Sequence, residues 1–329
     1  MIISRAPVRI SFFGGGSDIP DFYREYGGAV ISTAINKFVF VTINSKFDNR
    51  LRVAYSRTEE VSSAADIEHP LVRAALQHVG IEGGIEITTV ADIPSRGTGL
   101  GSSSSLTVAL LNGLYAFRNR YVSAIDLGAE ASHIEINVCR EPIGKQDQYA
   151  AAVGGFNFFE FLRDDTVVSS PIVCSETTRN KLESNLLMLY TGITRSASAL
   201  LQEQSAELKV NSDKRIVMQR MVRLCFDVRN EIQNDNLMGF GEALHEGWML
   251  KKGLTTNISS NEIDDWYAVA RSVGAVGGKI LGAGGGGFLL LYAPPDRHGA
   301  ICHALPNLRP IPFRFERNGT QIIFYQPSY

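Results

Sequence analysis

The chain has few cysteines, and their arrangement excludes two common kinds of site. Four occur among 329 residues, with no CxxC pair and no spacing typical of metal ligands. A disulfide framework or a zinc site would need closely paired cysteines. We therefore expect free thiols, a reducing compartment and a cytoplasmic protein.

Excess charge and long apolar runs are also missing. Lys and Arg number 32 and Asp and Glu 34, so the net charge is −2 and no broad basic surface is expected. No apolar run approaches the roughly 18 residues of a membrane-spanning helix, and the N-terminal segment does not resemble a signal peptide. We expect neither a nucleic-acid nor a membrane partner, and an anionic substrate would need a local cluster of cations.

The length and the order of patterns predict two lobes. A chain longer than about 250 residues tends to divide into domains. Strand patterns dominate the first half and long helical patterns the second, which is typical of an α+β protein. We place the boundary near residue 165, giving lobes over 1–165 and 166–329. Expected strands cover 2–12, 29–47, 51–56, 84–90, 156–161, 186–191, 286–292 and 320–325; expected helices cover 66–79, 102–117, 124–139, 196–209, 213–234, 237–252, 261–273 and 295–304.

The segment PSRGTGLGSSSS (94–105) has the composition of an anion-binding loop. Three glycines in five positions free the backbone to curve around a ligand, and the loop leads directly into a predicted helix. Unpaired amides and the helix dipole at such a start favour an anion. The segment is not a Walker A loop, since no Lys-Ser or Lys-Thr follows its last glycine. A flexible loop that only caps a helix is the alternative.

Two further glycine segments and two acidic residues add to this interpretation. Glycines cluster at 14–16 and at 277–287, and a simple turn would need fewer. Asp147 stands between two glutamines in GKQDQY, and Glu135 shares an apolar helix face. A carboxylate on such a face is often paired or bound to a metal. A solvated or capping role is the alternative for each.

Together these segments resemble the galactokinase–homoserine kinase–mevalonate kinase–phosphomevalonate kinase (GHMP) superfamily along essentially the whole chain. APVRISFFGGGSD (6–18), PSRGTGLGSSSS (94–105) and GGKILGAGGGGFLLL (277–291) are similar to its three motifs, in the same order. The resemblance implies an N-terminal α/β lobe with a left-handed crossover and a ferredoxin-like C-terminal lobe. It also implies an enzyme that uses ATP and Mg²⁺.

The resemblance assigns roles to individual residues. Asp147 would lie beside the acceptor hydroxyl, as a base or as an orienting group, with Arg9 as its basic partner. Ser103 and Glu135 would be magnesium ligands. The residues expected to bind ATP are Gly97, Gly99, Leu100, Gly101, Ser102, Ser103 and Ser104. The residues expected to bind substrate are Gly15, Gly16, Ser17, Asp18, Arg195, Lys252, Gly284 and Gly285.

The form of the first motif bears on the substrate. Galactokinases have Gly-Glu-His where this chain has Gly14, Gly15 and Gly16, so side chains that would grip galactose are missing. The motif is most similar to that of bacterial kinases of D-glycero-D-manno-heptose 7-phosphate, which phosphorylate the anomeric hydroxyl. That resemblance implies a product used for nucleotide-activated heptose in surface polysaccharide. Fucokinase-type enzymes share the glycine-rich motif and are the nearest alternative.

A sugar phosphate would need cations in its pocket. Arg195 follows a glycine turn at a predicted helix start, where amides and a guanidinium can hold phosphate together. Lys251 and Lys252 end a predicted helix, a favourable place for cations with or without a ligand. A homodimer is compatible with the sequence, which does not decide the oligomeric state.

Two other functions remain to be compared with a sugar-phosphate kinase. A non-catalytic sensor of nucleotide and sugar would be free to lose Asp147, Arg9 or Glu135, and all three are present. A kinase of a mevalonate-type alcohol or an amino-acid hydroxyl would keep the fold, and only the form of the first motif argues against it. We therefore predict a sugar kinase.

Overall fold

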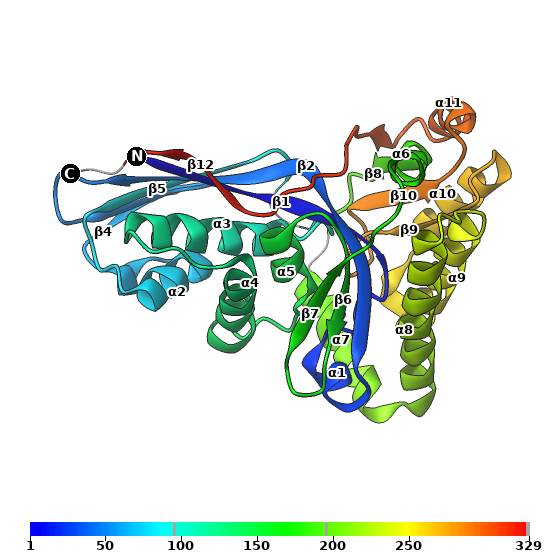
Figure 1. The fold of residues 1–329 in the computed structure, drawn as a ribbon, viewed down its shortest axis with the longest axis horizontal. Helices are drawn as coiled ribbons and strands as arrows, with labels where there is room; N and C mark the ends of the chain where they lie inside the picture. The colour runs from blue at the N-terminus through cyan, green and yellow to red at the C-terminus, as the bar shows by residue number, and fades with distance from the viewer. Residues whose placement is uncertain (95–96, 195–196, 327–329) are drawn as a thin grey trace.

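The computed structural model describes residues 1–94, 97–194 and 197–326. The chain forms two lobes, each built on one sheet, which lie side by side along the longest axis of the molecule (Figure 1). The α+β class and the two-lobed arrangement are thus as predicted. The N-terminus and the last described strand, β12 (Gln321–Tyr325), lie at the far end of the first lobe (Figure 1).

The first lobe is built on a sheet of eight strands within the described residues, with order β12-β1-β2-β5-β3-β4 and with β6 and β7 joined through β2. The long strand β2 holds this sheet together, because its first half pairs with β6 and its second half with β5. The strands are β1 (Ile2–Phe13), β2 (Gly28–Ser45), β3 (Leu51–Ala54), β4 (Thr58–Val61), β5 (Ile85–Ala91), β6 (Phe156–Phe161), β7 (Val167–Pro171) and β12 (Gln321–Tyr325).

Helices cover one face of this sheet (Figure 1). The central one has the bounds that its apolar spacing predicts, and it buries Leu110 and Leu114 against β1 and β2. Its neighbours leave a polar end facing the second lobe. The helices are α2 (Pro70–Val79), α3 (Ser102–Phe117), α4 (Ala124–Ser132) and α5 (Gln146–Val153), with a 3₁₀ turn at Ala64–Asp66 and a π-helix at His133–Val138.

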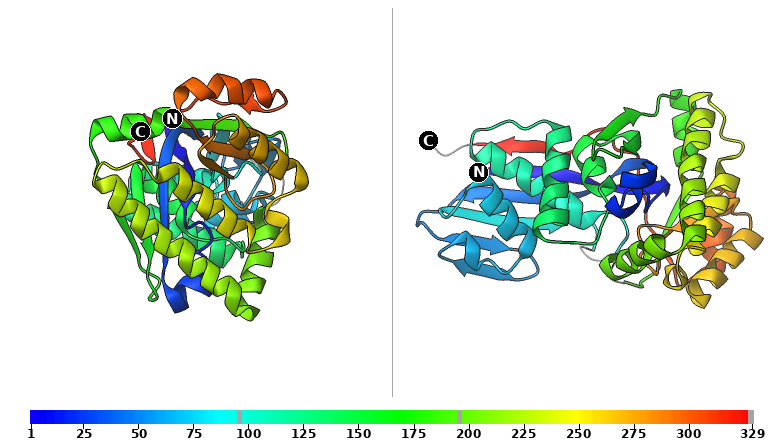
Figure 2. Two further views of the ribbon diagram at one scale, coloured as in Figure 1. Left: turned by 90° about the vertical axis from the view of Figure 1, so that its right-hand side faces the viewer. Right: turned by 90° about the horizontal axis from the view of Figure 1, so that it is seen from below.

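The second lobe has a four-stranded antiparallel sheet of order β11-β8-β10-β9 in the described part of the chain. Its long helices gather at the end of the molecule opposite the termini (Figure 2). The strands are β8 (Leu186–Tyr190), β9 (Gly277–Ile280), β10 (Phe288–Tyr292) and β11 (Arg309–Pro310). The helices are α6 (Glu176–Ser184), α7 (Ala197–Val210), α8 (Ser212–Gln233), α9 (Phe240–Lys252), α10 (Asn261–Ser272) and α11 (Pro295–Ala304), with a 3₁₀ turn at Thr256–Ile258.

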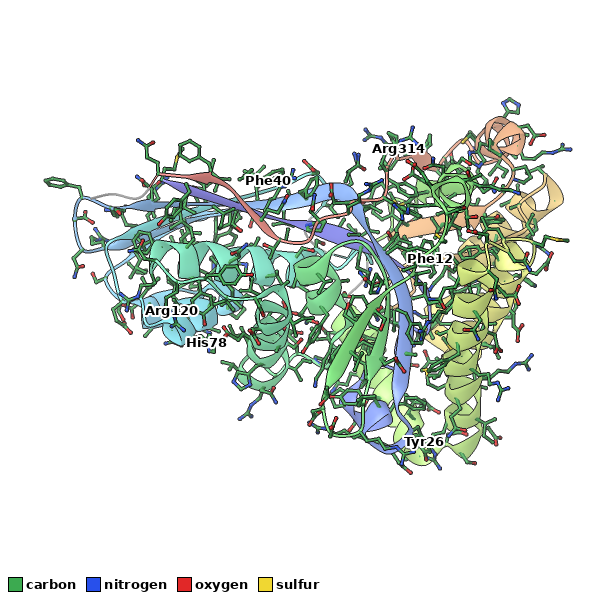
Figure 3. The ribbon with its side chains drawn as sticks, viewed as in Figure 1. Phe12, Tyr26, Phe40, His78, Arg120 and Arg314 are labelled. Carbon is green, nitrogen blue, oxygen red and sulfur yellow. The ribbon has the colours of Figure 1, made fainter. Side chains whose placement is uncertain are left out.

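Aromatic packing joins the two lobes. Phe12, at the junction in Figure 3, is buried and meets Phe156, Phe240 and Phe315 edge-on, with ring centroids 5.6–6.3 Å apart. These rings come from β1, β6, α9 and the C-terminal tail. Edge-to-face pairs of this kind add to the stabilisation from apolar burial. The junction between the lobes is therefore packed like a domain core.

The boundary predicted at residue 165 is corrected by the sheet topology. β7 pairs with β6, and β12 pairs with β1, so residues after 165 complete the sheet of the first lobe. Hydrophobic periodicity could not show this, because it reports which face of a strand is buried and not which strand it pairs with. α1 (Pro20–Tyr26), α5 and α6 were also not predicted. No helix in the described ranges is long and apolar enough to span a membrane.

Candidate active site

The loop before α3 presents backbone rather than side chains at the start of the helix. Gly97, Gly99 and Gly101 have φ angles of 68°, 76° and 76°, in the left-handed region that favours glycine. Gly101 is the N-cap of α3 and offers no side-chain acceptor to the amides of the first turn. An anionic ligand can supply that acceptor, since the positive end of the helix dipole lies there.

Leu100 and the serines that follow it differ in how far they are exposed to solvent. Leu100 is buried in the core, and its carbonyl accepts a hydrogen bond from the amide of Arg9 at 3.0 Å. Ser103 is exposed in the first turn of α3. Ser102 lies 3.3 Å from Thr98 through their hydroxyls, and Ser104 is buried against Glu135. Of the three serines predicted to bind nucleotide, Ser103 is the one that solvent reaches most freely.

The second and third glycine segments touch. A Cβ on Gly99 would lie 2.3 Å from the carbonyl oxygen of Leu281, and one on Gly287 would lie 2.4 Å from that of Thr98. Real Cβ atoms do not approach so closely, so glycine is required for this contact. The glycine segment at 277–287 therefore packs directly against the loop before α3.

Gly284 and Gly285, predicted to contact substrate, pack against the 3₁₀ turn at Thr256–Ile258. The amide of Gly285 donates to the carbonyl of Ile258 at 2.9 Å, and a Cβ on Gly284 would lie 2.7 Å from the same oxygen. The structure thus gives both glycines a close protein neighbour. Their contact with substrate stays a prediction.

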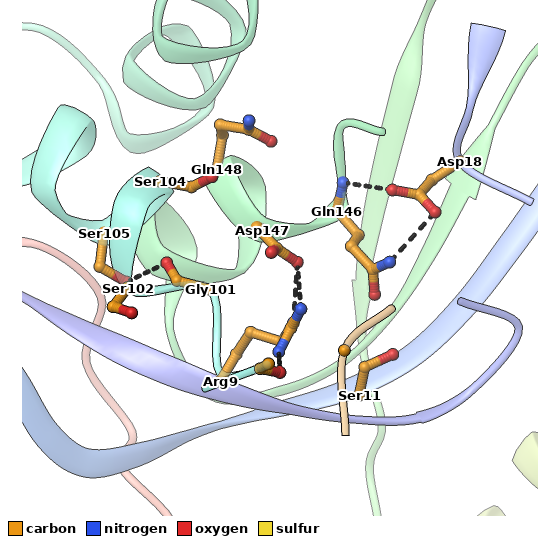
Figure 4. Close-up of polar contacts among 12 residues, drawn as sticks. Arg9, Ser11, Asp18, Gly101, Ser102, Ser104, Ser105, Gln146, Asp147 and Gln148 are labelled. Carbon is orange, nitrogen blue, oxygen red and sulfur yellow. Dashed lines mark hydrogen bonds and ion pairs between the residues drawn. The ribbon is translucent and has the colours of Figure 1, made fainter. Parts of the chain in front are cut away.

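Arg9 and Asp147 form the centre of the site. Arg9 is 3% exposed, and its Nε and Nη2 lie 2.8 Å and 2.6 Å from Oδ1 of Asp147 (Figure 4). Its Nη1 donates to the carbonyl of Gly99 at 2.6 Å. A Cβ on Gly101 would lie 3.1 Å from Oδ2 of Asp147, so that oxygen faces the start of α3. The structure brings together the predicted Arg9–Asp147 pair and the predicted phosphate loop.

Asp18 lies near this pair and accepts three hydrogen bonds from protein donors. Its Oδ1 accepts from the amide of Gly16 at 2.9 Å and from Nε2 of Gln146 at 3.0 Å; its Oδ2 accepts from the amide of Gln146 at 3.0 Å (Figure 4). Burial raises the pKa of Asp18; the Gln146 amide opposes the rise, and the negative charge of Asp147 adds to it. In this arrangement Asp18 ties the first motif to the residue before Asp147.

Ser17, Gly15 and Gly16 of the first motif also make close contacts with neighbouring segments. The hydroxyl of Ser17 donates to the carbonyl of Ala29 and accepts from its amide, at 3.0 Å and 3.1 Å. A Cβ on Gly15 would lie 3.4 Å from Oγ of Ser11, and one on Gly16 would lie 2.3 Å from Nε2 of Gln204. The motif therefore forms a tight backbone turn with polar side chains close against it.

Glu135 is a buried carboxylate in the π-helix. Ser104 donates to it at 2.7 Å, and Thr107 and Gln148 also donate to it. Burial raises its pKa to about 7, these three hydrogen bonds oppose the rise, and Asp147 adds to it. π-Helical turns are rare and occur often at functional sites. Here the turn directs Glu135 at the first turns of α3, where Ser103 also lies.

An oxygen-only pair of ligands such as Glu135 and Ser103 fits the preference of Mg²⁺. That ion is usually held by one or two carboxylates together with substrate phosphates. The described residues contain no group of three or more His, Cys, Asp and Glu that could hold a metal without such phosphates. The residues present therefore suit a magnesium ion that arrives with a nucleotide.

Of the predicted cations, Lys252 does not reach the site. Its ammonium pairs with Asp264 of α10 at 2.5 Å, whereas the preceding Lys251 is buried and donates to the carbonyl of Gly282. Successive residues of a helix point about 100° apart, so only one of the two can face inward. Arg195 lies outside the described residues.

The sequence predicted Asp147 and its partner Arg9 but not the roles of the two glutamines beside Asp147. The two flanking glutamines bind the two neighbouring carboxylates: Gln146 binds Asp18 and Gln148 binds Glu135. Oγ of Ser11, Oε1 of Gln146 and Nε2 of Gln204 are buried atoms without a hydrogen-bond partner in the described structure. The repeated glutamine in GKQDQY could have indicated the roles of Gln146 and Gln148. No sequence pattern distinguishes Gln204 on α7 from other polar residues.

Comparison with known proteins decides the family. Residues 63–155 match the family described as GHMP kinases N terminal domain, and residues 229–308 match GHMP kinases C terminal. The chain belongs to the GHMP kinase superfamily. This GHMP kinase is an ATP-dependent sugar kinase.

Several relatives of this GHMP kinase cover nearly its whole length. It is 25% identical to D-glycero-alpha-D-manno-heptose 7-phosphate kinase of Campylobacter jejuni, over 92% of this chain and 93% of that one. It is 28% identical to a bifunctional fucokinase/GDP-fucose pyrophosphorylase of Arabidopsis thaliana, over 87% of this chain but 29% of that one. A crystal structure of a D-glycero-D-manno-heptose 1-phosphate kinase from Bacteroides thetaiotaomicron superposes with a TM-score of 0.82 at 26% identity, covering 99% and 100% of the two chains.

Proposed function

We propose that this GHMP kinase phosphorylates the anomeric hydroxyl of D-glycero-D-manno-heptose 7-phosphate, giving the 1,7-bisphosphate, with ATP and Mg²⁺. The observation that carries the kinase chemistry is Asp147, held by Arg9 with Oδ2 toward the start of α3. The heptose is favoured by the relatives that share most of this chain. The product would serve the synthesis of nucleotide-activated heptose for surface polysaccharide.

The reaction needs few covalent roles from the protein. The acceptor oxygen forms a bond to the γ-phosphorus as the bond to the bridging oxygen of ADP breaks, and the hydroxyl proton leaves. Asp147 either accepts that proton or orients the hydroxyl. Phosphoryl transfer relies on positioning and on neutralisation of charge, which here come from the amides of α3, from Arg9 and from the glycine loops.

The bound magnesium ion would neutralise phosphate charge, with Glu135 and Ser103 as its protein ligands. Glu135 must lose its proton to bind a metal, and its pKa of about 7 makes this possible near neutral pH. The hydrogen bonds from Ser104, Thr107 and Gln148 orient the carboxylate.

Two alternatives to this proposal are a kinase of an unphosphorylated sugar and a non-catalytic sensor. A fucokinase- or galactokinase-type enzyme acts on an unphosphorylated sugar; a fucokinase relative supports the first of these, and the glycines at 14–16 argue against galactose. A non-catalytic sensor would not need the Arg9–Asp147 pair, which is fully formed.

The test is ADP release with MgATP across a panel of acceptors: mannoheptose 7-phosphate, mannoheptose 1-phosphate, mannose 6-phosphate, fucose, galactose and mevalonate. We expect the highest kcat/KM with mannoheptose 7-phosphate, and ³¹P NMR of the product should show a new phosphate at the anomeric carbon. A preference for a free sugar would reject the heptose phosphate but keep the kinase. No ADP release with any acceptor would favour the sensor.

A further inference from the structure

The second lobe contributes a buried cation whose role the Arg9–Asp147 chemistry does not explain. Lys251, in the last turn of α9, is 3% exposed, and its ammonium donates to the carbonyl of Gly282. Among the described residues no carboxylate lies within ion-pair distance of it. Its neighbour Lys252 has the ordinary arrangement, an ion pair near the surface with Asp264.

Burial of an ammonium group without a carboxylate is costly. Such a group has three donors and loses its hydration, and a single carbonyl replaces only part of that. The C-terminal end of α9 contributes a favourable dipole, which offsets only part of this cost. A purely structural link to a carbonyl would not require a charged donor. An anionic ligand near Lys251 would account for the charge.

Contacts connect Lys251 to the reaction site. A Cβ on Gly282 would lie 2.4 Å from Cα of Gly99, so the carbonyl partner of Lys251 belongs to a residue that touches the phosphate loop. The carbonyl of Gly99 in turn accepts from Arg9, which binds Asp147. Lys251 therefore approaches the loop from the second lobe, and Arg9 approaches it from the first.

The charged groups around Lys251 agree with this placement. Burial lowers the pKa of Lys251 to about 8; the positive charge of Arg9 adds to this, and Asp18 and Asp147 oppose it. Lys279, which donates to the carbonyls of Ser11 and Phe12, is the other buried lysine that senses this site. Lys251 is therefore within electrostatic reach of Arg9, Asp18 and Asp147.

We propose that Lys251 binds the phosphoryl group during its transfer, as a cation supplied by the second lobe. This inference rests on the kinase function proposed above. Each guanidinium nitrogen of Arg9 already donates to Asp147 or Gly99, so Arg9 is held in place as the partner of Asp147. Lys251 keeps donors that no described residue uses. Charge on the equatorial oxygens of the transferred group is what such a cation stabilises.

The test compares Lys251→Met, Lys251→Arg and the matched control Lys252→Met on whichever acceptor the wild type phosphorylates. Lys251→Met should lower kcat about 10²- to 10³-fold and change the KM for ATP by less than about threefold. Lys251→Arg should recover part of the loss, and Lys252→Met should behave like wild type. Thermal unfolding of each variant shows whether it is folded.

Several outcomes would overturn the proposal. A kcat for Lys251→Met within about twofold of wild type would do so. So would equal losses in Lys251→Met and Lys252→Met, or a raised KM for the acceptor at unchanged kcat, which would make Lys251 an acceptor-binding group. A wild type that prefers mevalonate would reject only the sugar substrate, since the comparison among variants uses its preferred acceptor.

A second measurement covers the case in which Lys251→Met does not fold. The wild-type kcat should fall as the pH rises above about 8, because Lys251 then loses its proton among Arg9, Asp18, Asp147 and Lys279. Lys251→Arg stays charged, so this fall should move to higher pH. Identical alkaline limbs in the two proteins would overturn the role.

Discussion

Asp147→Asn removes one negative charge from the site and preserves most of its contacts. Both donors of Arg9 end on Oδ1 of Asp147, at 2.8 Å and 2.6 Å. The carboxamide oxygen of asparagine can take that place, and its NH₂ group then replaces Oδ2, the oxygen that faces Gly101. The substitution therefore acts on the oxygen available to the acceptor hydroxyl.

The effect on turnover should be large, and the protein should also lose stability. Asparagine leaves the buried guanidinium of Arg9 without its carboxylate, and breaking a buried ion pair in this way costs about 3 kcal/mol, which lowers the Tm of a chain of this size by several degrees. Loss of the carboxylate should lower kcat about 10²- to 10⁴-fold, whether Asp147 accepts the proton or orients the hydroxyl. ATP binding should survive, because the N-terminal end of α3 is unchanged.

The assay is kcat from ADP release, with ATP binding measured by calorimetry and Tm by thermal unfolding. Asp48→Asn is the matched control. Asp48 is an exposed carboxylate that pairs with Lys46, and it has no role in the proposed reaction. Turnover of Asp147→Asn within about tenfold of wild type would remove Asp147 from the mechanism. A loss of ATP binding as large as the loss of kcat would show that the residue only holds the loop.

Three further predictions follow from the geometry. Glu135→Gln should raise the Mg²⁺ concentration for half-maximal activity about tenfold or more, and an unchanged magnesium titration would leave Glu135 a structural role. Gly99 has a φ of 76°, and the carbonyl oxygen of Leu281 occupies the place that a Cβ would take. Gly99→Ala should therefore lower the free energy of unfolding by more than about 2 kcal/mol. Gly192→Ala has a similar φ of 75° but open space around it, so equal losses in urea unfolding would argue against the contact between the loops. The hydrogen bond from Arg24 is the main cause that lowers the pKa of Asp165 from 3.8 to about 2, so stability from this pair is present above pH 3.8 and lost as the pH falls toward 2. Asp165→Asn should flatten that part of the stability profile, and an unchanged slope in acid unfolding would contradict the pairing.

Several features of the structure could be predicted because they depend on local pattern. The central helix has the predicted bounds, 102–117, since leucines four residues apart and a glycine before the first turn specify both its face and its start. The strand at 156–161 also has its predicted bounds. The family resemblance supplied Arg9, Asp147 and Glu135, and the structure brings all three to the same end of α3.

Other features depend on contacts between distant residues. Pairing of β12 with β1 joins residues more than 300 positions apart, for example Ile2 with Tyr325, and strand patterns carry no information about such partners. The helix of Asp147 was missed, although its tethers, Gln146 and Gln148, were visible as a repeated residue type. Their importance follows only from where Asp18 and Glu135 lie.

The amino-acid sequence by itself determined that this chain has three glycine segments, a helix ready to receive an anion and the acidic residues of a GHMP kinase. These follow from backbone freedom, periodicity and residue type. Only the tertiary structure decided that Lys251 rather than Lys252 faces the reaction site. The two lysines are adjacent and chemically identical, so the packing of α9 against β9, which buries one side of the helix, is what distinguishes them.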